Sequence, residues 1–244
     1  MEKSLVSLLL FFILTVITFI IRYYQTSASV IRVVYIVYFL MVFISQFFIN
    51  LNITKDICQY YQPTVAFFTT ILPWGFVFGS LNVLLLMFPG WKAPFSNTIG
   101  YLFAQLGGIR DVMNNILPSK ISNNKMLEDI YEKIVEDNSL LINEITPGNF
   151  NDFWSKMKAS NLLSRNAPMY KEKLYNLVKV KDLTSEFVWY FLTGTLISSI
   201  TYNYISNIQC KRNAKVLKEE HVKWETEKNK KLEKEDRKIY TIRD

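Results

Sequence analysis

The sequence is poor in the residues from which most metal and redox sites are made. It has two cysteines, Cys58 and Cys210, and a single histidine, His221. Two thiols are too few for a disulfide framework and lack the CxxC spacing of a zinc site, so we expect both to be reduced, with S-acylation of Cys210 as the alternative. One histidine argues against zinc peptidases and di-iron membrane enzymes, which need several at helical spacing.

Charge is also scarce at the start of the chain: the first 100 residues contain five basic and two acidic side chains. Half of all residues are apolar, which is too many for an ordinary water-soluble domain. Long uncharged runs occupy residues 4–21, 33–49 and 64–88. The third run would rise about 37 Å as a helix, more than a hydrocarbon core of about 30 Å, and Pro73 can kink it. We therefore predict three membrane spans within residues 1–109, with a loop at 50–63.

The first run has a competing interpretation as a cleaved signal peptide. Lys3 would form its basic region, and the small residues Thr26 to Ser29 would form its cleavage site. The run is longer than the usual apolar region of a signal peptide, and Arg22 with two tyrosines flanks it as a membrane anchor would. We favour a retained span.

The segment after the third run combines prolines, glycines and aromatics in a way typical of an ordered exit from a membrane. Pro89 and Gly90 would end the helix, Trp91 would lie at headgroup depth and Lys92 would face water. We predict a fixed, turn-rich path rather than one helix. We interpret this segment as a re-entrant or interfacial turn. The alternative is a docking epitope for a partner. The residues of this predicted turn are Pro89, Gly90, Trp91, Pro94, Phe95, Asn97, Gly100 and Tyr101.

The second half of the chain divides into three predicted parts. Residues 110–186 carry apolar side chains at helical spacing and predict an extramembrane domain of short amphipathic helices. Residues 187–208 predict a fourth span, the least apolar one. Small and polar side chains that let helices approach closely recur in it at Gly194, Thr195, Ser198, Ser199 and Asn203. This stripe would pack against the other spans or, as the alternative, form a homo-oligomer contact.

Residues 209–244 form a charged tail that predicts a solvated helix. Basic residues close to a span attract anionic headgroups and favour a cytoplasmic side. In this tail they are Lys211, Arg212, Lys215 and Lys218. Nucleic-acid binding is not favoured, because eight acidic residues dilute the positive charge and no aromatic platform accompanies it.

No pattern in the chain indicates an enzyme or a cofactor site. Five carboxylates between residues 128 and 137 lack the glycine of a calcium loop and any histidine partner, so we interpret them as a solvated helix face. The spans have no central charge of the kind that ion and proton paths need, which argues against a channel. We expect no catalytic residue, metal or cofactor. The sequence predicts an all-α, multi-span helical membrane protein with an extramembrane helical segment and a charged helical tail.

The block from Phe88 to Tyr101, placed directly after a span, resembles membrane-embedded virion proteins of large double-stranded DNA viruses of algae and protists. The resemblance covers about residues 74–108. It implies a minor capsid protein that anchors the internal membrane of an icosahedral particle to its shell. Its partners would be the lipid bilayer and the major and other minor capsid proteins. A membrane-resident enzyme or transport factor acting on lipid is the alternative.

Overall fold

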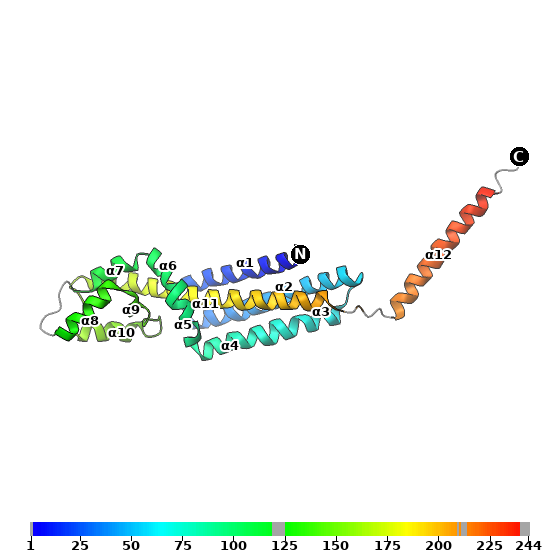
Figure 1. Ribbon diagram of the computed structural model, residues 1–244. Coiled ribbons are helices and arrows are strands. Elements are labelled where there is room, and N and C mark those ends of the chain that lie inside the picture. Colours follow the sequence, from blue (N-terminus) through cyan, green and yellow to red (C-terminus); the bar gives the residue numbers. More distant parts are fainter. Residues whose placement is uncertain (1, 119–124, 209, 211–213, 240–244) are drawn as a thin grey trace. The chain divides into compact units, whose positions relative to one another are not determined.

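The computed structural model describes residues 2–118, 125–208, 210 and 214–239, and every regular element in that part of the chain is a helix (Figure 1). The chain forms two compact units, Met1–Ser206 and Asn207–Asp244. The second unit contains one helix, α12 (Ala214–Ile239), where the sequence predicts a solvated tail helix.

Three helical stretches of the first unit are long and apolar enough to cross a membrane. They are α1 (Glu2–Tyr24), α2 (Ala28–Cys58) and the stretch Pro63–Met87. The three predicted apolar helices are therefore present. The predicted loop at 50–63 is wrong for its first part, because α2 continues to Cys58 with Ile53, Thr54 and Cys58 buried. The Asn50 amide of α2 donates to Thr70 Oγ1 at 2.9 Å, which fastens this extension to the next helix.

The third stretch changes its helix type around its proline. It consists of α3 (Pro63–Thr70), the π-helical η1 (Ile71–Phe78) and α4 (Gly79–Met87). Pro73 has no backbone N–H to donate, so the ordinary four-residue ladder cannot pass through it. The π-helical turns place Trp74 and Phe78 in the core of the bundle, where both are buried.

The centre of the first unit is α11 (Ala167–Ser206), a single helix of 40 residues. Its C-terminal half packs against α1, α2 and the Pro63–Met87 stretch, and its N-terminal half packs against the helices of the 110–186 region (Figure 1). The sequence places a boundary at 186/187, but α11 crosses that position without a break. The two halves of the unit therefore share one helix.

The 110–186 region has its own hydrophobic core, as its amphipathic spacing predicts. Around the first half of α11 it places four shorter helices: α7 (Ile109–Ile116), α8 (Lys125–Glu136), α9 (Ser139–Ile142) and α10 (Phe150–Ala159). Ile109, Met113, Phe150 and Leu174 are among the fully buried side chains of this core. We call this part the helical domain.

The expectation of two reduced thiols is wrong. Cys58 and Cys210 are both disulfide-bonded, and neither is a free thiol. A low cysteine count argues against a framework of several bridges, but it does not decide whether an individual cysteine is oxidised.

Candidate membrane-boundary site

The segment that leaves the third apolar stretch is helical from Pro89 to Leu106. It runs through η2 (Pro89–Lys92), α5 (Ala93–Phe95), η3 (Ser96–Gly100) and α6 (Tyr101–Leu106). The preceding helix ends at Met87, as Pro89 and Gly90 predict, and the path is not one regular helix. The predicted turns are wrong, because short helical segments of different type take their place. The prolines of this segment stand in the first turns of η2 and α5, where a helix needs no N–H from them. We call residues 89–106 the collar.

The inner face of the collar contacts α11 at backbone distance. A Cβ atom on Gly100 would stand 2.5 Å from the carbonyl oxygen of Lys181. Only glycine allows η3 to come this close, because any side chain would overlap the α11 backbone. Phe95 and Trp91 continue the same contact, with ring centroids 6.4 and 6.2 Å from that of Trp189.

The outer face of the collar is apolar and exposed. Ile99, Leu102, Phe103 and Leu106 point away from the core, and Leu106 is 77% exposed. Trp91 stacks on Phe88 with their ring centroids 5.8 Å apart. An exposed apolar helix face next to membrane-length helices is the pattern of a segment that lies in the headgroup region.

The eight residues of the predicted exit turn divide between these two faces. Pro89, Gly90, Trp91, Pro94 and Asn97 are exposed, whereas Phe95 and Tyr101 are half-buried and Gly100 is buried. A Cβ atom on Gly90 would meet no atom of the described chain within 4 Å. The exposed five are available to a lipid or protein partner, and Trp91 among them also contacts Trp189. Phe95 and Gly100 hold the collar on α11.

Four charged side chains from three elements meet beside the collar. Arg22 Nη1 of α1 lies 3.0 Å from Glu186 Oε1 of α11. Lys92 Nζ of η2 lies 2.8 Å from Asp182 Oδ2 and 3.8 Å from Glu186 Oε2. The Tyr35 hydroxyl of α2 donates to Glu186 Oε1. We call Arg22, Lys92, Asp182 and Glu186 the boundary cluster.

The boundary cluster is balanced in charge and largely shielded from water. Its side chains are between 7% and 17% exposed. The Arg22 guanidinium also lies over the rings of Phe19 and Tyr35, at 5.2 and 4.4 Å from their centroids. Removing one partner from such a pair leaves an uncompensated charge and costs about 3–5 kcal/mol when burial is complete. The cluster thus ties α1, α2, the collar and α11 together at one level.

Sequence reasoning singled out the two cations of this cluster as membrane flanks and missed both acids. Its expectation that Lys92 faces water is wrong, because this side chain is only 17% exposed and pairs with Asp182. The two acids could have been recognised from their spacing: Asp182 and Glu186 are four residues apart, so they share one helix face, and they stand just before an apolar run. Their partners are 90 or more residues away along the chain, so no local pattern joins them.

Two further lysines of α11, Lys179 and Lys181, lie just before Asp182 in the chain. Lys181 is 1% exposed, and its Nζ donates to the Ile142 carbonyl oxygen at 2.7 Å. Burial is the main cause that lowers the pKa of Lys181 to about 8; Asp182 and Glu144 oppose the shift, and Lys92 adds to it. Lys179 Nζ donates to the Tyr23 carbonyl oxygen at 2.6 Å.

The small-residue stripe of α11 divides between the inside and outside of the bundle. Gly194 is buried against the ring of Phe11, and Ser198 Oγ lies 3.2 Å from Ser7 Oγ of α1. The Thr195 and Ser199 hydroxyls donate to backbone carbonyls of their own helix. Ser199 and Asn203 are exposed. The first pair therefore belongs to the α1–α11 contact.

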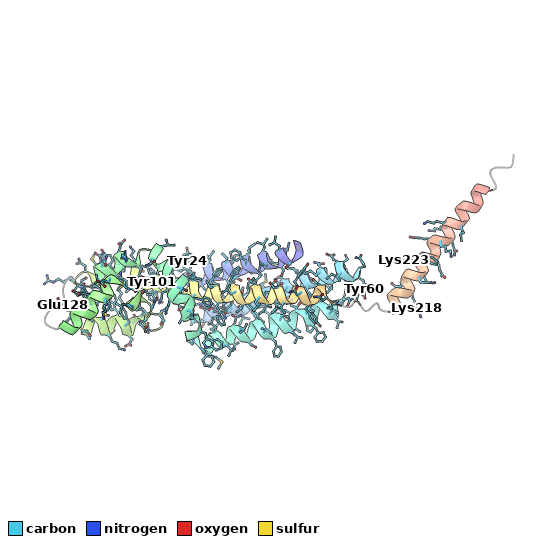
Figure 2. All side chains as sticks on the ribbon, in the orientation of Figure 1. Tyr24, Tyr60, Tyr101, Glu128, Lys218 and Lys223 are labelled. Carbon is cyan, nitrogen blue, oxygen red and sulfur yellow. The ribbon has the colours of Figure 1, made fainter. Side chains whose placement is uncertain are left out.

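The basic residues of the tail are only partly within the described chain. Lys218 is exposed on α12 (Figure 2), and Lys215 belongs to the same helix. Lys211 and Arg212 lie outside the described residues. Their predicted role at a membrane surface stays a prediction.

Within the described residues, no group of three or more His, Cys, Asp or Glu side chains is arranged to hold a metal ion. No protein-family model, curated protein or solved structure matches this chain.

Proposed function

We propose that this protein is a structural membrane anchor that crosses a bilayer four times and holds its helical domain at the membrane surface. The observation that carries the proposal is the continuity of α11 from the core of the helical domain into the apolar bundle. A single helix that belongs to both parts transmits force between them without a hinge.

Three features support the membrane location. Three helices have the length and composition of membrane spans, and their outward faces are apolar, with Leu9, Val37 and Val83 at least half exposed. Tyrosines flank the bundle, with Tyr24 at the end nearer the helical domain and Tyr60 at the other end (Figure 2). Exposed tyrosine and tryptophan at both ends of apolar helices form the aromatic belts of membrane proteins.

Residues 187–206 of α11 provide the fourth crossing in this proposal. They would rise about 30 Å, which is the thickness of a hydrocarbon core. Their buried face packs on α1, where Gly194 and Ser198 permit close approach. Three of their hydroxyls, those of Thr193, Thr195 and Ser199, donate to carbonyls one turn earlier, so these groups are paired within the helix and can face lipid.

The partner of the anchored domain is, in this proposal, the protein shell of a virus particle with an internal membrane. The protein would then act as a minor capsid component that links the membrane to the shell. The boundary cluster and the collar support such a role, because they brace α1, α2 and α11 where a pull on the helical domain would reach the bundle.

Particle fractionation tests this proposal. The protein should resist alkaline extraction from membranes and should co-purify with intact particles, in constant ratio to the major shell protein, after surface proteolysis. Trp91→Ser and Pro94→Ser, which alter exposed collar residues, should lower the ratio, whereas Lys156→Ala on exposed α10 should not. Recovery of the protein only with cell membranes would exclude the capsid role, and solubility without detergent would exclude the anchor.

A further inference from the structure

An apolar groove of about 540 Å³ lies beside the boundary cluster, between α1, the collar and α11. Val16 and Tyr24 mark its extent along α1, and Thr184 and Val188 line it on α11. Phe103 closes it on the collar side. The stretch from Val16 to Tyr24 rises about 12 Å along the helix axis. The groove therefore reaches from the end of α1 into the part of the bundle that lies in the bilayer.

A lysine, Lys179, lies beside the end of this groove nearer the helical domain, next to the lining residue Tyr23 and outside the lining itself. Lys179 Nζ contacts the carbonyl oxygens of Tyr23 and Gln25 and lies 5.4 Å from the Tyr23 ring centroid, and Tyr23 lines the groove. Among the described residues, no carboxylate forms an ion pair with Lys179. Burial lowers the pKa of Lys179, and the nearby positive charge of Arg22 lowers it as well. Arg22 is balanced by Glu186, whereas Lys179 has no ion pair with a described carboxylate.

We propose that this groove binds one anionic phospholipid, with an acyl chain along α1 and α11 and the phosphate beside Lys179. The inference rests on the membrane location proposed above. The apolar trough has the size of a small-molecule site and would hold the acyl chain. The basic residue beside it, at the headgroup level, would hold the phosphate.

The charge and size of the groove favour a lipid over a protein partner. A stable protein contact needs about 800 Å² on each side, and a trough about 12 Å long provides much less. A second apolar groove, of about 760 Å³, lies between α2 and α4. Neither groove has a lysine or arginine in its described lining, but the cation beside the second groove is Arg22, which lies over Tyr35 and is paired with Glu186. The second groove serves as an internal comparison, because lipid bound there should not depend on headgroup charge.

The test measures lipid retained by the full-length protein in detergent, by native mass spectrometry. The probes are phosphatidylglycerol and phosphatidylcholine with identical acyl chains. Wild type should retain one phosphatidylglycerol in preference to phosphatidylcholine. Lys179→Gln should weaken phosphatidylglycerol binding about fivefold, the loss expected for one basic residue near an anionic surface. Lys158→Gln, which removes an exposed cation on α10, should leave binding unchanged.

A second variant tests the apolar half of the site. Thr184→Trp should fill the trough and reduce binding of both lipids, whereas Val83→Trp in the α2–α4 groove should not affect the headgroup-selective lipid. If Thr184→Trp lowers the unfolding temperature, the result for Lys179→Gln decides, because that substitution removes the charge beside the groove and changes no residue of its apolar lining. Equal retention of the two lipids by wild type, or unchanged binding by Lys179→Gln, would overturn the proposal. Displacement by millimolar inorganic phosphate would show a free-anion site instead. Solubility of the protein without detergent would contradict the proposed membrane location, whatever the lipid-binding measurements show.

Discussion

Gly100 lies against the backbone of Lys181, so that a Cβ on Gly100 would stand 2.5 Å from the Lys181 carbonyl oxygen. This contact fixes the collar on α11 at the level where the apolar bundle meets the helical domain. The opposing atom is backbone within a long helix, and it cannot move aside as a flexible side chain would.

Gly100→Ala should therefore destabilise the protein, by about 1–3 kcal/mol, the usual cost of forcing one extra carbon into a packed contact. Gly90→Ala is the matched control, because it adds the same atom in the same segment where nothing lies within 4 Å. Thermal unfolding of the two variants in detergent measures the difference. Equal unfolding temperatures would show that η3 can withdraw from α11 without loss.

The boundary cluster predicts a large effect of removing one negative charge. Glu186→Gln should destabilise the protein by up to about 3–5 kcal/mol, because it leaves Arg22 without its anion in a shielded position. Asp152→Asn removes a carboxylate that pairs with Lys156 on the exposed face of α10, so its cost should stay below about 1 kcal/mol. Denaturant unfolding compares the two, and similar losses would mean that the cluster is solvated.

The buried Lys181 makes stability depend on pH in a defined direction. Its pKa is lowered from 10.5 to about 8 by burial, so between these values the unfolded chain binds more protons than the folded one. Stability should therefore rise with pH from about 8 towards 10.5. The full effect is about 3 kcal/mol, at about 1.36 kcal/mol for each unit of pKa shift.

Lys181→Met isolates this contribution, since methionine keeps an apolar stem and does not titrate. The unfolding midpoint of wild type should rise relative to that of the variant as pH increases from about 7.5 to about 10. Comparing the two proteins removes the effect of Lys179, whose lowered pKa acts in the same direction. A constant difference across this range would contradict the assignment of a titrating, buried lysine.

The sequence predicts the parts of this fold that depend on composition and fails where residues distant in the chain meet. The uncharged runs are long enough to identify α1, α2 and the Pro63–Met87 stretch. The prediction for the collar is wrong because proline and glycine usually mark turns, whereas Pro89 and Pro94 occupy first turns of helices here. The pairing of Arg22 with Glu186 joins α1 to α11 across most of the chain, and only the packing of these two helices determines it.

The α1–α11 contact gives the last prediction, and it separates the two interpretations of the small-residue stripe. Gly194→Leu should disrupt the bundle, because the ring of Phe11 already occupies the space that its side chain would need. Ser199→Leu places the same side chain on the exposed face of the same helix and should leave the unfolding temperature nearly unchanged. Size-exclusion chromatography with light scattering adds a second measurement. If Ser199→Leu alone changes the number of copies in the detergent complex, the exposed half of the stripe forms a homo-oligomer contact. If neither variant changes stability or copy number, α11 does not depend on close packing in this region.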